Sequence, residues 1–151
     1  MTLSSPAFLA GQAIPKQYTC DGQNVNPPLV FSDVPSNTIS LVLVMDDPDV
    51  PKNLKPDGVF DHWVLYNIPA GTAGIQENFS NIGQLGKNSS GQAAYTGPCP
   101  PNGQHRYFFK LFALDTELQF ADNPTKQQVL DAIANHILAR AELMGVYDRG
   151  K

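Results

Sequence analysis

The stretch Ile39-Ser-Leu-Val-Leu-Val-Met45 is the strongest single element of the sequence, and it decides the fold. It is almost continuously apolar and rich in β-branched residues, which is typical of a strand buried on both faces. The strand is expected to stop at Asp46-Asp-Pro-Asp-Val-Pro51, because two prolines and three carboxylates oppose its continuation and favour a turn. We therefore build the expected fold around a central strand over residues 39–45.

Three further segments have the pattern of strands: His62-Trp-Val-Leu-Tyr-Asn-Ile68, His105-Arg-Tyr-Phe-Phe-Lys-Leu-Phe-Ala-Leu114 and the shorter Pro28-Leu-Val-Phe31. Within the segment 105–114, the period of two puts alternate side chains on one face: His105, Tyr107, Phe109 and Leu111. The connection Gly71–Pro101 is much longer than a usual loop. A loop of that length in a compact domain indicates a functional role.

The last part of the chain changes to a helical period. Its apolar residues fall on one helical stripe: Val129, Leu130, Ile133, Ile137, Leu138, Ala141 and Met144. Asn123 suits an N-cap, Pro124 the first helical position and Gly145 the C-terminal stop. The sequence therefore predicts a mainly β domain, an antiparallel β-sandwich with one long C-terminal helix packed on it.

Composition restricts the classes of protein to which the chain can belong. Its 151 residues, with no internal repeat or linker, predict a single domain over residues 1–151. Ten Lys and Arg against 14 Asp and Glu give a net charge of −4, which argues against nucleic-acid and anionic-membrane binding. No apolar run approaches the roughly 20 residues of a membrane span. Because Met1–Gly11 lacks the features of a signal peptide, we expect a cytoplasmic protein.

Two cysteines, Cys20 and Cys99, lie 79 positions apart. Two are too few for a disulfide scaffold, and no CxxC spacing for zinc or redox chemistry occurs. Free thiols fit a cytoplasmic chain, whereas one disulfide fits an oxidising compartment, so both states stay open.

The polar residues of interest lie at strand ends. Asp47 and Asp49 follow the central strand, His62 begins the second strand, and His105 begins the third with Tyr107 on the same face. Strand ends gather at one rim of a sandwich, so we expect these groups to meet there. An imidazole can donate one N–H to a ligand while a carboxylate holds its other nitrogen. Such a set suits a small oxyanion such as phosphate, bound without a Lys or Arg clamp.

Three separated motifs carry a family resemblance: Asp46–Pro51, Asp61–Pro69 and Gly97–Asp115. In this order they resemble the phosphatidylethanolamine-binding protein family, and most closely its bacterial and archaeal Raf-kinase-inhibitor-like branch. The resemblance runs from Tyr18 to Gly145. It implies a Greek-key β-sandwich with a small pocket for phosphate, phosphoryl head groups and similar anions.

The resemblance also implies which residues form the pocket: Asp47, Asp49, Phe60, His62, Gly97, Pro98, His105 and Tyr107. In this assignment His62 and His105 donate to the ligand, and Asp47 orients an imidazole. Gly97 offers its backbone N–H and Tyr107 its hydroxyl, while Pro98 and Phe60 form the wall. The loop Lys52–Gly58 is longer than in the shortest bacterial relatives, and Ser90 and Gln92–Ala94 replace more typical residues of the family. These departures affect the rim of the pocket and therefore the size of the ligand.

We therefore expect a non-catalytic binding protein for a small phosphorylated or anionic ligand, without a cofactor. The resemblance further implies a protein kinase or phosphoprotein as partner, and homodimers. Two enzyme classes stay open as alternatives. A hydrolase would combine Asp47, a histidine and Ser89 or Ser90, although no Gly-x-Ser-x-Gly elbow occurs. A metal-dependent enzyme would use two histidines and an aspartate, although no HExxH spacing occurs.

Overall fold

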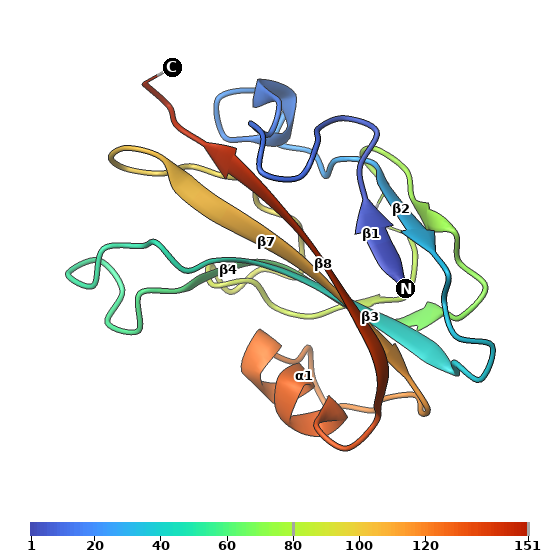
Figure 1. Cartoon of the computed structure of the whole chain (residues 1–151). Coiled ribbons are helices and arrows are strands. Elements are labelled where there is room, and N and C mark those ends of the chain that lie inside the picture. Colours follow the sequence, from blue (N-terminus) through green and yellow to red (C-terminus); the bar gives the residue numbers. More distant parts are fainter. Residues whose placement is uncertain (80, 151) are drawn as a thin grey trace.

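Two antiparallel β-sheets lie face to face in the computed structural model, which describes residues 1–79 and 81–150 (Figure 1). The smaller sheet has the order β1 (Thr2–Ser4), β2 (Leu29–Ser32) and β5 (Gly74–Ile75). The larger sheet has the order β6 (Gln84–Leu85), β4 (Phe60–Pro69), β3 (Ser40–Asp47), β7 (His105–Leu114) and β8 (Ile137–Tyr147). A short 3-10 turn (Lys16–Tyr18) and one helix, α1 (Lys126–Ile133), complete the described elements. The predicted mainly β, antiparallel architecture is confirmed.

The central strand β3 is buried along its whole length, as its composition predicts. Its odd-numbered side chains, such as Leu43 and Met45, lie in the core between the two sheets. Val42 and Val44 point to the opposite face and pack beneath α1. Each face of β3 therefore meets a separate apolar layer, and this explains why the segment contains almost no polar residues.

The strand continues two residues beyond the expected stop, through Asp46 and Asp47. A buried carboxylate is tolerated only where a partner compensates it. Asp46 accepts from Lys110 at 3.2 Å and from Lys126 at 3.0 Å, on the outer face of the larger sheet. Asp47 points to the inner face, where it meets His105. Because both carboxylates have partners, the strand ends only at Pro48.

The other predicted strands are present with shifted ends. The segment 105–114 forms β7 with the predicted bounds, and its face of alternate residues is buried: His105, Tyr107, Phe109 and Leu111. The segment 62–68 is extended at both ends in β4, and 28–31 corresponds to β2. The long connection 71–101 holds two short strands, β5 and β6.

One helix is present near the C-terminus, but its predicted length is wrong, because α1 spans only the eight residues Lys126–Ile133. Its N-cap is Thr125 rather than Asn123. The Thr125 side chain accepts from the backbone of Gln128, and the Gln128 side chain accepts from the backbone of Thr125, which together form a capping box. The helix packs on the larger sheet through Val129 and Ile133, the first part of the predicted stripe.

The second half of that stripe is the strand β8, which pairs with β7 along its whole length. Alternate residues of β8 face the core, and Leu143 is among them, so the segment also fits a period of two. Gly145 does not end a helix. A Cβ at this position would approach Ile14 Cγ1 to 2.6 Å and Phe8 Cε2 to 2.8 Å, so a larger residue would displace these two side chains of the N-terminal segment.

No helix among residues 1–79 and 81–150 is both long enough and apolar enough to cross a membrane.

Candidate functional site

A cavity of about 660 Å³ opens where β3 ends and where β4 and β7 begin. These strand ends are held together by sheet register, because Asp47 lies opposite Phe60 and Asp46 lies opposite Phe108. The cavity is lined by Asp47, Val50, Leu54, Lys55, Phe60, His62, Ser89, Ser90, Thr96, Gly97, Cys99, Pro100, Pro101 and His105. The structure therefore brings five of the eight expected residues to one cavity: Asp47, Phe60, His62, Gly97 and His105.

Asp47 and His105 form a buried pair within this cavity. Asp47 Oδ2 lies 2.7 Å from His105 Nδ1, and each side chain is only about 5% exposed. The other oxygen of Asp47 accepts from the backbone N–H of Asp49 at 2.8 Å, which fixes the carboxylate. Since a carboxylate accepts hydrogen bonds, the proton lies on Nδ1 of His105. The remaining nitrogen, Nε2, is left for a ligand.

His62 is held in the same tautomer by a different group. Its Nδ1 lies 2.7 Å from the carbonyl oxygen of Thr96, and a carbonyl can only accept, so Nδ1–H donates. Burial lowers the pKa of His62 below its ordinary value of 6.5, although the Thr96 carbonyl and the charge of Asp47 oppose this shift. The imidazole is therefore neutral at neutral pH, with the lone pair on Nε2.

Tyr107 packs behind both imidazoles and does not line the cavity. The centroid of its ring lies 5.3 Å from that of His62 and 6.5 Å from that of His105. Its hydroxyl is buried without a hydrogen-bond partner of good geometry in the described structure. Burial raises the pKa of Tyr107 strongly, and the charge of Asp47 raises it further. The phenol is thus neutral and packs against the two histidine rings, and the donation of its hydroxyl to a ligand stays a prediction.

Gly97 lines the cavity, but its backbone N–H is already used. It donates to Asn24 Oδ1 at 2.7 Å, so this N–H is not free for the expected donation to a ligand. The sequence does not reveal this hydrogen bond, because Asn24 lies 73 residues from Gly97 along the chain. Glycine is needed here for another reason, since a Cβ would collide with the carbonyl oxygen of Tyr18 and lie 2.6 Å from Asn24 Oδ1.

Pro98 and Asp49, like Tyr107, are not among the residues that line the cavity. Pro98 turns its carbonyl to the backbone N–H of Cys20 at 3.1 Å, and Pro100 and Pro101 form the wall in its place. Asp49 binds Arg106 through three donors, the backbone N–H, Nε and Nη2, at 2.8–2.9 Å. These hydrogen bonds lower the pKa of Asp49 and hold its carboxylate on the outside of the rim.

Cys20 and Cys99 form a disulfide bond. This resolves the choice that the sequence left open between thiols and a disulfide. Cys99 lines the cavity, so the bond ties the cavity wall to the segment around Cys20. The Gly97 and Pro98 contacts described above tie the same wall to residues 18–24. The loop 97–101 is therefore fixed in position by covalent and polar links to a distant part of the chain.

Thr96, Lys55 and Leu54 line the cavity but are not among the predicted site residues, for two different reasons. Thr96 acts through its backbone carbonyl, which no residue type reveals. Lys55 and Leu54 belong to the loop Lys52–Gly58, which the sequence placed at the rim without a contact. Lys55 Nζ is held by Asp57 at 3.0 Å, so the one cation in the cavity lining is partly neutralised. Within residues 1–79 and 81–150, no group of three or more His, Cys, Asp or Glu is arranged to hold a metal ion.

The substitution Gly97→Ala is expected to cost about 1–3 kcal/mol of stability, because the added methyl group collides with backbone that cannot move aside. Urea denaturation would measure the loss. Gly71→Ala is the matched control, since a Cβ there meets nothing within 4 Å. Equal stability of the two variants would contradict the close approach at Gly97.

The model of the phosphatidylethanolamine-binding protein family matches residues 4–148. The chain belongs to this family. The UPF0098 protein of Chlamydia pneumoniae is 48% identical over 149 residues, which cover 99% of each chain. The UPF0098 protein of Methanothermobacter thermautotrophicus is 46% identical over 156 residues, which cover 99% of this chain and 100% of the relative.

Solved structures of the phosphatidylethanolamine-binding protein family superpose closely on this chain. A family homologue from Chlamydia trachomatis has a TM-score of 0.95 and 44% identity, over 98% of this chain and 97% of its own. YbcL of E. coli, described as a new member of the mammalian family, has a TM-score of 0.86 and 28% identity over 97% of each chain. The expected family and fold are thus confirmed over nearly the whole chain.

Proposed function

We propose that this chain is a non-catalytic binding protein for a small phosphoryl or other anionic ligand, held by Nε2 of His62 and of His105. One observation carries the proposal. Each imidazole uses Nδ1 to donate to a fixed acceptor at 2.7 Å, and both rings line one cavity. The two free Nε2 atoms are the ring atoms left to meet a ligand.

The tautomers determine how such a ligand binds. With Nδ1–H committed, a neutral imidazole presents only a lone pair at Nε2, which repels an anion's oxygen. A proton on Nε2 turns each ring into a charge-assisted donor. Asp47 stabilises that charge on His105 and prevents the pair from becoming a net cation. The site therefore binds an oxyanion by sharing a proton with it, rather than with a permanent Lys or Arg clamp.

His105→Ala is expected to weaken the binding of inorganic phosphate by about tenfold or more, because a charge-assisted hydrogen bond contributes on the order of 1.5–3 kcal/mol. Isothermal titration calorimetry at about pH 6 would measure the change. His136→Ala is the matched control, because His136 also pairs with an aspartate, Asp115 at 2.8 Å, but lies outside the cavity lining. If a folded His105→Ala variant binds phosphate like the wild type, the ligand site is elsewhere.

A hydrolase would need a nucleophile held by one of the histidines. Ser89 and Ser90 line the cavity, but in the described structure no serine hydroxyl bonds to His62 or His105. Ser89 Oγ instead accepts from the backbone N–H of Asp61 at 2.8 Å. We therefore expect no turnover of a generic ester. Turnover that is lost in Ser89→Ala would favour the hydrolase.

A phosphoprotein would present the same phosphoryl group to this cavity, as the family resemblance implies for a kinase partner. We expect a phosphoserine peptide to compete with inorganic phosphate, and the unphosphorylated peptide not to compete. Competition by both peptides would show that the phosphoryl group is not what the site recognises.

A further inference from the structure

The disulfide bond and the two cavity histidines lie in one cavity, although the proposed function uses only the histidines. Cys99 lines the cavity together with His62 and His105. Cys99 is exposed, whereas its partner Cys20 is half-buried. A thiolate that opens a disulfide must reach one of the two sulfur atoms, and access decides which of them it attacks. The cavity therefore favours attack at Cys99 over attack at Cys20.

The cavity has room for more than a bare oxyanion. Its volume of about 660 Å³ is within the range of sites that bind whole organic ligands, whereas phosphate or sulfate is one small ion. Much of the lining away from the histidines is apolar: Val50, Leu54, Phe60, Pro100 and Pro101. An oxyanion at the histidines thus leaves space with apolar walls for a short carbon chain attached to it.

The charges of the lining determine which thiols the cavity selects. Besides the two histidines, the ionisable lining residues are Asp47 and Lys55. Asp47 is paired with His105, and Lys55 is paired with Asp57 at 3.0 Å. The imidazoles, once protonated on Nε2, are therefore the groups left to donate to a guest. A thiol with an acidic group can accept these hydrogen bonds, and a neutral thiol of the same size lacks the charge for them.

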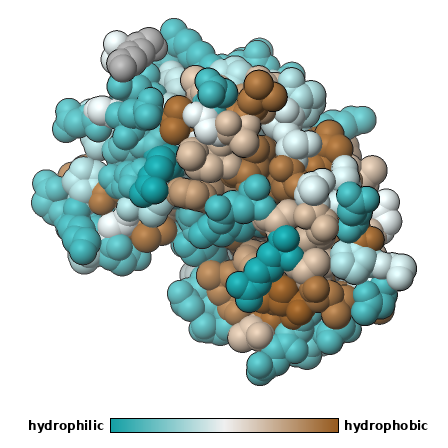
Figure 2. Space-filling view, viewed as in Figure 1, coloured by the Kyte–Doolittle hydropathy of each residue, from teal (hydrophilic) through white to brown (hydrophobic). Residues whose placement is uncertain are grey.

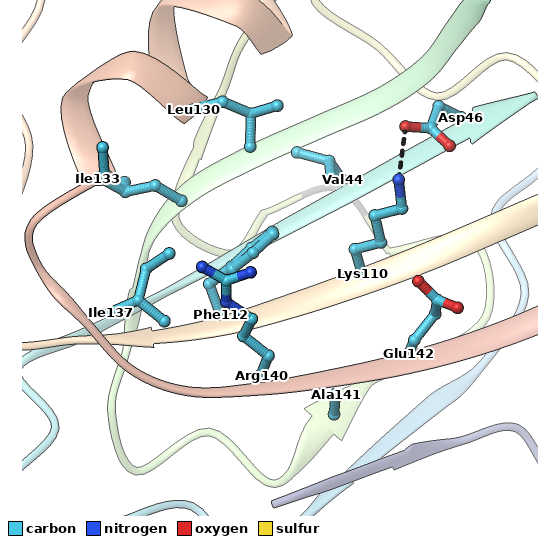
Figure 3. A pocket seen from close by; sticks show the side chains of 11 residues that line it. Val44, Asp46, Lys110, Phe112, Leu130, Ile133, Ile137, Arg140, Ala141 and Glu142 are labelled. Atoms are coloured by element: carbon cyan, nitrogen blue, oxygen red, sulfur yellow. Dashed lines mark hydrogen bonds and ion pairs between the residues drawn. The ribbon is translucent and has the colours of Figure 1, made fainter. Parts of the chain in front are cut away.

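A second cavity, of about 670 Å³, lies between α1 and β8 and offers a comparison. No histidine or cysteine is among the described residues that line it. Figure 3 shows apolar side chains of α1, Leu130 and Ile133, facing the cations Lys110 and Arg140 of the sheet. Figure 2, drawn in the view of Figure 1, shows hydrophobic surface on both sides of a hydrophilic band across this face. An anion at Arg140 has no sulfur beside it, so this residue provides a control for general effects of charge.

We propose that an anionic low-molecular-weight thiol binds in the ligand cavity through its acidic group and exchanges with the disulfide at Cys99. This step rests on the proposed function, because the acidic group takes the place of the oxyanion at His62 and His105. The thiolate sulfur forms a bond to Sγ of Cys99, the Cys20–Cys99 bond breaks, and its electron pair stays on Sγ of Cys20. That sulfur takes up the proton that the attacking thiol released. The thiol is oxidised and Cys20 is reduced, so the step needs no further oxidant or reductant.

The exchange changes the ligand site in two ways. The mixed disulfide on Cys99 keeps the acidic group inside the cavity, so the product should no longer bind sulfate. The covalent link from the cavity wall to Cys20 is also lost, and the wall is then held only by polar contacts such as that of Gly97 with Asn24. An anionic thiol therefore switches the anion site off.

Mercaptoethanesulfonate and mercaptoethanol are a matched pair of probes, because one carries a sulfonate where the other carries a hydroxyl. At about pH 6 and low concentration, we expect the sulfonate to open the disulfide about tenfold faster per thiolate, because it binds before its sulfur reacts. Its rate should saturate with concentration, whereas the rate with mercaptoethanol should rise linearly. Alkylation of the freed Cys20 thiol measures both rates, and mass spectrometry should find the adduct on Cys99.

Sulfate tests the same site without a variant. It should compete with mercaptoethanesulfonate and remove its advantage over mercaptoethanol. His105→Ala should also remove the advantage, because it removes one of the two donors. Arg140→Ala is the matched control, since it removes a cation at the second cavity and should leave both rates unchanged.

Equal rates per thiolate for the two probes, or an adduct found on Cys20, would overturn the proposed exchange. Calorimetry with sulfate on the same protein separates this failure from a failure of the proposed function. If sulfate binds while the two probes react equally, the anion site stands and the exchange is rejected. If sulfate does not bind and the probes react equally, both the anion site and the exchange are rejected.

Discussion

The affinity for sulfate is expected to fall about tenfold for each pH unit above the lowered pKa of His62, because binding is coupled to protonation of its Nε2. Sulfate carries no proton of its own near neutral pH, so the imidazoles must supply it. Their Nδ1 protons are committed to Thr96 and Asp47, and only protonation at Nε2 creates a donor. Because burial lowers the pKa of His62, the affinity should still be rising below pH 6.5.

Calorimetry from about pH 5.5 to 8.5 would measure this slope across the ordinary titration range of histidine. Repeating each titration in two buffers with different ionisation heats counts the protons directly. His136→Ala should leave the profile unchanged. A sulfate affinity that does not vary over the range would show that neutral groups hold the anion, while the absence of binding at every pH would reject the proposed function itself.

The lowered pKa of His62 also makes the stability of the fold depend on pH, in the direction opposite to that of the sulfate affinity. The pKa of His62 is lowered in the folded chain, so the unfolded chain binds more protons in the window below the ordinary value of 6.5. The contribution of His62 to stability is therefore fully present above pH 6.5, and it is lost as the pH falls from 6.5 through the lowered pKa of the folded chain. Sulfate, which needs the protonated ring, should protect the fold against acid.

Removal of the disulfide is expected to cost about 4–5 kcal/mol of stability, because the bond closes a loop of 79 residues and constrains the unfolded chain. Urea denaturation of the variant Cys20→Ser/Cys99→Ser would measure the loss, and the wild type in reductant should match it. The Cys20→Ser variant alone should lose nearly as much. An unchanged midpoint in all three would show that the thiols are not paired in solution.

The disulfide also bears on the ligand site and on localisation. Cys99 lines the cavity, so the same variants should bind phosphate more weakly even where they remain folded. Disulfides persist mainly in oxidising compartments. The bond therefore favours such a compartment over the cytoplasmic location that the sequence led us to expect, and a thiol count on protein taken directly from cells would decide between the two.

The sequence by itself determined the sheet and the gathering of the histidines. The apolar run 40–45 forms a strand with an apolar layer on each side, as predicted, whereas Ile39 precedes the strand and is exposed. His105 is the first residue of β7, and His62 is the third residue of β4. Antiparallel pairing of both strands with β3 therefore brings the two histidines close to Asp47 at the end of β3. These are consequences of local pattern and of sheet geometry, which a sequence carries directly.

Tertiary structure alone decided the features that depend on a distant partner. Residues 137–147 fit a helical stripe as well as an alternating strand, and the open edge of β7 selected the strand by offering a ladder along its full length. The N–H of Gly97 and the carboxylate of Asp49 were taken by Asn24 and Arg106, 73 and 57 residues away. Local propensity differs by only fractions of a kcal/mol between such alternatives, so contacts made across the chain determine the outcome.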